Sequence, residues 1–175
     1  MTPPPGTRDR DPAGRPRNAR PRDEFGRPLR RGAPGEPPLP DAPALAPEAA
    51  LDLAQQLIDD GRAFRAHEVL EASWKAAPPA ERDLWQGLAQ VAVGLTHAQR
   101  GNARGAAALL RRGAGRVAGC AGERVAGCAG EPAPHGVAAA QVARDATRLA
   151  DLIERDGLAS AGPAALRITL RGAVR

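Results

Sequence analysis

Imidazole and carboxylate side chains recur at helical spacing in the segment 64–74, which reads Phe-Arg-Ala-His-Glu-Val-Leu-Glu-Ala-Ser-Trp. On a helix, steps of three and four residues place four of these side chains on one face: Phe64, His67, Glu71 and Trp74. Three of the chain's four aromatic residues lie between positions 64 and 85, so we expect this face to point into the protein. It would carry His67 and Glu71 inward, with Glu68 beside them. A buried carboxylate is costly unless it is paired or hydrogen-bonded, so other polar groups should face these glutamates.

The segment that follows supplies such groups. Four residues spaced by four, three and four positions share one helical face: Gln86, Gln90, Val93 and His97. If the two helices pack antiparallel, this face could lie opposite His67, Glu68 and Glu71. The expected cluster then holds two carboxylates, two imidazoles and two amides within a mostly apolar helical bundle.

Three kinds of chemistry fit this cluster. A satisfied polar network would fix the register of the helices. Alternatively, a divalent metal could be held by histidine and carboxylate ligands, as in helical di-iron proteins: His67, Glu68, Glu71 and His97. The order His-Glu-x-x-Glu differs from the Glu-x-x-His pairs of those proteins and from the His-Glu-x-x-His of zinc proteases. The third possibility is acid–base catalysis, in which burial raises the pKa of Glu68 or Glu71 and His97 is the partner.

The same residues belong to a longer pattern that resembles a known family. The pattern consists of three parts in order: Phe64-x-x-His67-Glu68-Val69-Leu70-Glu71-x-x-Trp74, then Trp85-Gln86-Gly87-Leu88-x-Gln90-x-Ala92-x-Gly94-Leu95-x-His97, then Arg100-Gly101-Asn102-x-x-Gly105-Ala106-x-x-Leu109-Leu110. It resembles the helical family catalogued as domain of unknown function number 309, over about residues 50–112. The resemblance implies a small all-helical bundle with no established activity. By resemblance, the positions that match the family's pattern are His67, Glu68, Glu71, Trp74, Gln86, Gly101 and Asn102.

Turn residues divide the central part of the chain into about five helices, which predicts an all-α bundle. The expected helices cover residues 47–60, 62–76, about 80–100, 103–112 and 137–156. Gly101 would close one helix in the left-handed conformation, and Asn102 would cap the next. Gly87 and Gly94 share one face of the third helix, which indicates the close approach of another helix backbone.

A glycine-rich stretch interrupts this bundle domain of residues 47–157, and we expect residues 113–136 to form an exposed loop. Eight residues of this stretch, starting at Arg116, are repeated without change from Arg124, as a tandem duplication would produce. Cys120 and Cys128 are therefore copies of each other. Because their spacing is not Cys-x-x-Cys and no histidine pair accompanies them, we expect two ordinary thiols.

The last part of the chain, residues 158–175, is expected to be an extended tail. Within it, residues 166–170 alternate apolar and polar side chains, as a strand would. The sequence offers no obvious strand to pair with it. We therefore expect an extended segment that lies on the helices.

The N-terminal part differs in composition from the helical domain. Residues 1–47 contain 13 of the 18 prolines, so we expect a disordered Pro/Arg-rich arm over residues 1–46. The pattern Arg-Asp-x-x-Gly-Arg-Pro occurs at 10–16 and again at 22–28, which predicts a repeated turn with an exposed arginine. The first 47 residues hold nine arginines and six acidic residues, +3 of the chain's net +5. RNA binding through this arm is the weaker functional alternative.

Composition narrows the remaining classes of function. Two cysteines exclude a disulfide scaffold, and no uncharged run approaches the ~18 apolar residues of a membrane span. The chain starts without the apolar stretch of a signal peptide, so we expect a cytoplasmic protein that does not bind membranes. We expect a non-catalytic module that binds a protein partner or a small ligand through the polar cluster. The alternative is a metal-dependent or acid–base enzyme that uses the same residues.

Overall fold

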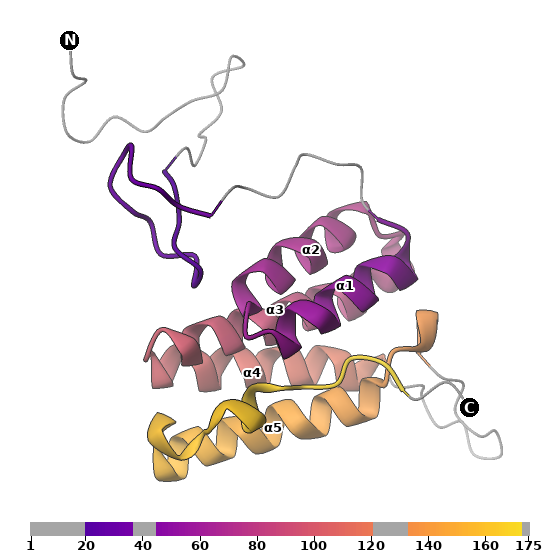
Figure 1. The fold of residues 1–175 in the computed structure, drawn as a ribbon. Coiled ribbons are helices and arrows are strands. Elements are labelled where there is room, and N and C mark those ends of the chain that lie inside the picture. Colours follow the sequence, from indigo (N-terminus) through magenta and orange to yellow (C-terminus); the bar gives the residue numbers. More distant parts are fainter. Residues whose placement is uncertain (1–19, 37–44, 121–132, 173–175) are drawn as a thin grey trace, which may run out of the picture. The chain divides into compact units, whose positions relative to one another are not determined.

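Helices dominate the computed structural model, which describes residues 20–36, 45–120 and 133–172. Five α-helices lie within the second and third of these ranges: α1 Pro47–Asp59, α2 Ala63–Ala76, α3 Arg82–Gln99, α4 Ala103–Gly119 and α5 Ala139–Asp156 (Figure 1). Four short 3-10 helices accompany them: η1 Pro79–Glu81, η2 Pro134–Gly136, η3 Leu158–Ser160 and η4 Pro163–Leu166. The prediction of an all-α protein with about five helices is confirmed.

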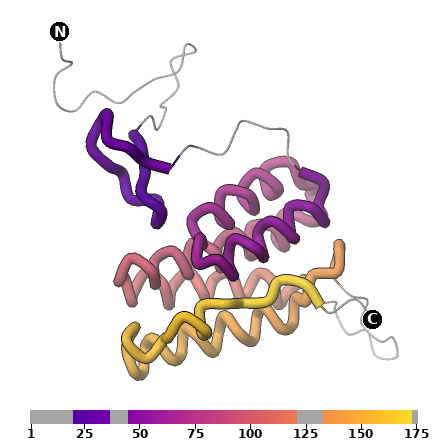
Figure 2. The backbone as a smooth tube through the Cα atoms, viewed as in Figure 1, coloured from indigo at the N-terminus to yellow at the C-terminus, as the bar shows by residue number. Residues whose placement is uncertain are grey.

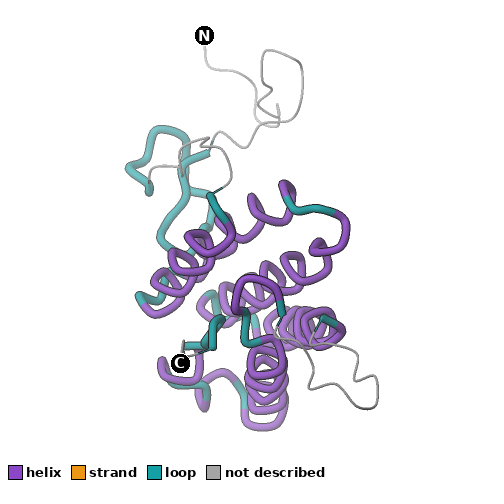
Figure 3. Tube along the Cα trace, turned by 90° about the vertical axis from the view of Figure 1, so that its right-hand side faces the viewer, coloured by secondary structure: helices purple, strands orange, loops and turns teal. Residues whose placement is uncertain are grey.

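Each α-helix packs against the next one along the chain (Figure 2). Short turns join α1 to α2 and α3 to α4, where Gly61 and Gly101 take left-handed φ values of 74° and 79°. The core between the helices draws on all five of them, and the following residues have no exposed surface: Leu51, Leu70, Leu88, Leu110 and Val142. The helices therefore form successive pairs that share one apolar core (Figure 3).

Glycines bring α3 and α4 into close contact. A Cβ atom on Gly87 would lie 2.7 Å from Val117 Cγ2, and one on Gly94 would lie 3.0 Å from the backbone nitrogen of Leu110. From the opposite side, a Cβ on Gly113 would lie 2.8 Å from the carbonyl oxygen of Gly87. The prediction that Gly87 and Gly94 mark a close helix approach is confirmed.

The same contacts explain why the expected end of α4 is wrong. Sequence analysis placed the end near Arg112 and a loop from residue 113, but α4 continues to Gly119. Each glycine costs a helix about 1 kcal/mol relative to alanine. Packing offsets this cost, because Gly113 fits against α3 and Val117 is fully buried. Residues 121–132, with the second repeat copy and Cys128, lie outside the described residues.

Cys120, in the first copy of the repeat, follows the last residue of α4. It is a free thiol, and its Sγ donates a hydrogen bond to the carbonyl oxygen of Arg116 at 3.4 Å. Burial raises the pKa of the Cys120 thiol, so it is less reactive than an ordinary cysteine at neutral pH.

The C-terminal segment, residues 167–172, lies on the helices as an extended chain. Ile168 and Leu170 are buried, as expected for an alternating segment. Gln55 of α1 takes the place of a strand partner: its Oε1 accepts a hydrogen bond from the backbone N–H of Leu170 at 2.7 Å. The preceding residues, 158–166, contain η3 and η4, so an extended conformation over the whole tail is wrong.

Residues 20–36 form a separate unit built from turns. Asp23 Oδ1 accepts hydrogen bonds from the backbone N–H groups of Phe25 and Arg27, and Gly26 adopts a φ of 73°. The predicted turn is thus confirmed in the second copy of the repeated heptapeptide, whereas the first copy lies outside the described residues. In the described part of the chain, no helix is long and apolar enough to cross a membrane.

Candidate functional site

The side of α2 that enters the core is not the one expected from the aromatic residues. Its buried positions are mostly small or aliphatic: Ala63, Ala66, Val69, Leu70 and Ser73. The row of Phe64, His67, Glu71 and Trp74, which we call the α2 row, is only half-buried. The inward orientation is therefore wrong, because alanines allow closer packing between helices than the larger side chains would.

A ladder of ionisable side chains runs along the α2 row. The His67 Nε2 atom lies 3.6 Å from Glu71 Oε2, and Lys75 Nζ lies 3.0 Å from Glu71 Oε1. The His67 and Glu71 side chains are 23% and 35% exposed. Burial lowers the pKa of His67 and outweighs the attraction of Glu71 and Glu68, so the imidazole is neutral at neutral pH. All of these contacts lie within one helix and join no second element.

Glu68 lies apart from this ladder, on the other flank of α2. Its Oε2 atom is 2.6 Å from Arg65 Nη1, and Arg65 is buried with 5% of its surface exposed. A buried guanidinium needs a counter-charge, which Glu68 supplies one helical turn away. Glu68 therefore serves the core-facing side of α2 rather than the α2 row.

His97 belongs to the turn between α3 and α4. Asn102 caps α4, since its Oδ1 accepts a hydrogen bond from the Gly105 N–H at 2.9 Å. The Asn102 amide NH2 group then faces His97 Nδ1 at 2.8 Å. Nδ1 must be the acceptor of this bond, so His97 is neutral with its proton on Nε2. Burial and the nearby charge of Arg100 both lower the pKa of His97, which agrees with this assignment.

The prediction of a turn at Gly101 and Asn102 is thereby confirmed. The turn also contains His97, which the sequence had placed in the polar cluster with His67, Glu68 and Glu71. A Cβ on Gly105 would lie 2.3 Å from His97 Nδ1 and 2.6 Å from Asn102 Nδ2. Glycine at this position is what lets the imidazole and the amide meet.

The metal site suggested by sequence does not form in the described ranges. No three histidine, cysteine, aspartate or glutamate side chains there are grouped so that they could hold a metal ion. The four suggested ligands have different partners: His67 and Glu71 pair with each other, Glu68 with Arg65, and His97 with Asn102. Acid–base catalysis would need His97 beside Glu68 or Glu71, but His97 contacts Asn102 and the glutamates contact residues of α2.

The polar residues of α3 form a second half-buried row. We call Gln86, Gln90, Val93 and His97 the α3 row. The end of α3 meets the start of α2, where the Arg100 guanidinium lies 5.7 Å from the centre of the Phe64 ring. The Oε1 atom of Gln90 is buried and has no hydrogen-bond partner in the described structure. The two rows therefore do not make the closed polar network that the sequence suggested.

Sequence analysis missed a second histidine–carboxylate group. His135, in η2, places Nδ1 3.1 Å from Glu48 Oε1 of α1 and Nε2 2.9 Å from Glu81 Oε2 of η1. The indole Nε1 of Trp85 also donates to Glu81 Oε2, at 3.2 Å. We call His135, Glu48 and Glu81 the His135 clamp. Its members lie 87 and 54 residues apart from the histidine, so no spacing pattern could reveal them.

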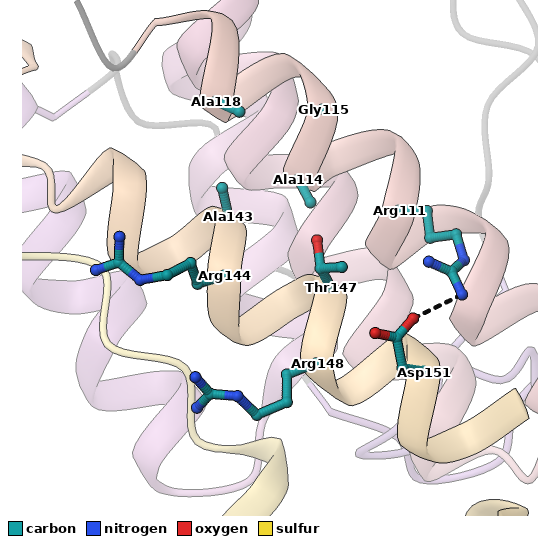
Figure 4. A pocket seen from close by; sticks show the side chains of 9 residues that line it. All are labelled: Arg111, Ala114, Gly115, Ala118, Ala143, Arg144, Thr147, Arg148 and Asp151. Atoms are coloured by element: carbon teal, nitrogen blue, oxygen red, sulfur yellow. Dashed lines mark ion pairs between the residues drawn. The ribbon is translucent and has the colours of Figure 1, made fainter. Parts of the chain in front are cut away.

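A groove between α4 and α5 was also not expected (Figure 4). Its volume is about 580 Å³ and its floor consists of small side chains: Ala114, Gly115, Ala118 and Ala143. Arg111 turns toward Asp151, and their closest atoms are 2.8 Å apart. Arg144 and Arg148 point away from α4 and bond to Gln141 and Asp145 of their own helix. The arginines at the rim are already partnered, so the groove shows no built anion site.

Comparison with known proteins agrees with the resemblance. Residues 51–109 match the family described as Domain of unknown function (DUF309). The chain is also similar to "Uncharacterized protein YpuF" of Bacillus subtilis (strain 168), with 38% identity over 67 residues. That match covers 38% of this chain and 38% of the relative, so the chain spans well under half of the relative's length. No solved structure matches the chain. The matched residues include both polar rows and the His97–Asn102 turn, but not His135.

Proposed function

We propose that the DUF309 segment of this chain, residues 51–109, is a non-catalytic protein-interaction module whose binding surface is the α2 row together with the α3 row. One observation carries the proposal: the ladder of the α2 row is partly exposed and, within the residues that the structure describes, its contacts run along its own helix. Such a ladder contributes little to folding, because His67 is neutral and the ion pair between Lys75 and Glu71 is of the surface kind, spaced by four residues, that is worth about 0.3–0.5 kcal/mol. Its residue types are better explained by what the surface contacts.

The composition of the surface supports a protein partner. Trp74 packs against the core on one side and remains half-exposed on the other, which suits an aromatic anchor at an interface. The two rows also hold amides, a neutral imidazole and a carboxylate, which offer both hydrogen-bond donors and acceptors. A surface of this composition fits another protein better than a small ligand, which needs an enclosed pocket.

Site-specific photo-crosslinking in the cell of origin tests the proposal. A benzophenone amino acid replaces Glu71 in the α2 row or, as the control, Thr147 in the groove between α4 and α5. We expect a discrete adduct with one protein from position 71 and none from position 147. Trp74→Ala in the position-71 protein should remove the adduct while circular dichroism shows an unchanged fold. Equal labelling from both positions, or no adduct from position 71, would contradict the proposal.

A further inference from the structure

His135 is positioned so that both of its ring nitrogens meet carboxylates. Glu48 approaches Nδ1 at 3.1 Å and Glu81 approaches Nε2 at 2.9 Å. Ionised carboxylates only accept hydrogen bonds, so both contacts are satisfied only when both nitrogens carry protons. A neutral ring has one N–H and would leave one carboxylate facing a lone pair. The geometry of the His135 clamp therefore selects the imidazolium form.

The charges around the ring favour the same form. Glu48 approaches the ring from α1 and Glu81 from η1. Behind them, Arg171 of the C-terminal segment acts on Glu48 and forms an ion pair with Asp52 of α1. These groups sum to two negative charges before the imidazole is counted, three carboxylates against one guanidinium. An uncharged side chain also lies beside the imidazole: the Trp85 ring centre lies 6.0 Å from that of His135. A proton on His135 thus reduces the net charge of the group.

The clamp holds more than its own turn, because η2 is bonded to the C-terminal segment. The Gly172 N–H donates to the Gly136 carbonyl at 3.2 Å, and the Ala138 N–H donates to the Leu170 carbonyl at 2.9 Å. Val137 and Arg171 also form an isolated antiparallel bridge. Residues 133–138 and 167–172 are therefore docked as a pair, and the His135 side chain ties this pair to α1 and η1.

The backbone of His135 has an unusual conformation, which the side-chain contacts help to maintain. Its φ and ψ are 60° and 20°, a left-handed conformation that non-glycine residues rarely adopt. On both sides of it, Ala133 and Val137 are buried. Without the two carboxylate contacts, the conformation of this turn would lose its main polar support.

We propose that the His135 clamp is a proton-operated fastening: it docks residues 133–138 and 167–172 onto α1 and η1 when the imidazole is protonated, and it loosens when the proton leaves. Loosening uncovers the apolar surface beneath Val137, Ile168 and Leu170. His135 and Glu48 lie outside the segment that matches the family, whereas Glu81 lies within it, and the device does not depend on the proposed interaction surface.

The direction of the pKa shifts agrees with this device. Burial lowers the pKa of His135, but the hydrogen bonds to Glu81 and Glu48 outweigh it, so the pKa is raised above 6.5. Docking is then fully favoured below the pKa of the undocked ring and weakens as pH rises through the docked one. The hydrogen bond from His135 lowers the pKa of Glu81. As pH falls, docking is therefore lost only when the Glu81 carboxylate becomes protonated.

Hydrogen exchange of the full chain tests the proposal, with the amides of Ala138, Leu170 and Gly172 as reporters. After correction for intrinsic rates, we expect their protection to fall several-fold between about pH 6 and 9, because the docked ring holds its proton to a higher pH than the undocked one. Amides in the middle of α3 should not change. In His135→Gln the reporters should exchange faster and lose this pH dependence, whereas the matched variant His67→Gln should retain it.

Three results would overturn the proposal: protection in the wild type that does not depend on pH, a His135→Gln profile with the wild-type slope, or a ring that titrates at or below 6.5. The last is measured by NMR on the wild-type chain, so it decides the question even if His135→Gln does not fold. The expected result there is a His135 midpoint above 6.5 that coincides with the midpoint of the exchange transition.

Discussion

Two histidine–carboxylate groups in this protein look alike in composition and differ in what they do. In the α2 row, His67 and Glu71 lie four residues apart on one helix and are half-exposed. In the His135 clamp, the histidine joins carboxylates from α1 and η1 across 87 and 54 residues. The first group could be removed without separating any two elements. The second connects three parts of the chain, and its loss would release one of them.

The difference shows that helical spacing predicts neighbours but not burial. The pKa values of the two histidines are also shifted in opposite directions. Burial dominates at His67 and lowers its pKa, whereas two hydrogen bonds outweigh burial at His135 and raise its pKa. A polar row whose contacts stay within one helix is a candidate for recognition. A group that holds the fold by charge is a candidate for control by pH.

The largest loss of stability is expected for a substitution on the core side of α2, and it serves as the reference for the two histidine–carboxylate groups. Leu70 is fully buried on the same helix as His67, and Leu70→Ala should destabilise the protein by about 2–5 kcal/mol through lost burial and a cavity. Urea unfolding followed by circular dichroism measures this loss. A loss below about 1 kcal/mol would mean that α2 contributes little to the cooperative core, and the contrast with the α2 row would disappear.

The next largest effect separates the two groups directly. Glu81→Gln leaves His135 and Trp85 with a weaker acceptor, so it should cost about 1–3 kcal/mol. The matched change Glu71→Gln removes only exposed contacts within α2 and should cost less than about 0.5 kcal/mol. Both values come from urea unfolding at pH 6. Equal costs would show that the two groups play the same structural part.

A smaller effect tests the turn that contains His97. Asn102→Ala removes the cap of α4 and the partner of His97 Nδ1, and should cost about 1 kcal/mol at pH 8. Thermal unfolding provides the measurement. Asn102→Asp keeps the cap but cannot donate to Nδ1, so it should raise the His97 pKa seen by NMR. An unchanged His97 titration in that variant would contradict the tautomer assignment.

The pH dependence of stability should differ in sign between the histidines. The pKa of His135 is raised, so its contribution is present below 6.5 and is lost as pH rises through the folded-state value. The pKa of His67 is lowered, so folding is penalised as pH falls below 6.5. His135→Gln should flatten the alkaline side of the stability profile, and His67→Gln the acid side. If His135→Gln flattened the acid side and His67→Gln the alkaline side, the assigned directions of the two pKa shifts would be contradicted.

Much of the fold could be predicted from the proline and glycine residues that mark helix ends in the sequence. Pro47, Gly61, the prolines at 78–79 and Gly101 sit at helix ends, where their backbone preferences operate locally. The extension of α4 could not be predicted, since the cost of Gly113 is offset by contacts with α3 that only the folded chain contains.

The site was predicted in part, for the same reason. The residues of the α2 row do share one face, as the periodicity indicates. Its orientation was wrong because alanines elsewhere on α2 pack more closely than Trp74 and Phe64 would. The His135 clamp was out of reach, because its three members come from segments with no common spacing.

The most direct test of the account is the stability of His67→Ala, measured by urea unfolding at pH 8, where His67 is neutral. If the α2 row serves recognition, the free energy of unfolding should change by less than about 1 kcal/mol, as for other surface substitutions. A loss of about 2–4 kcal/mol would show that the row is a structural network and would contradict the proposed interaction surface.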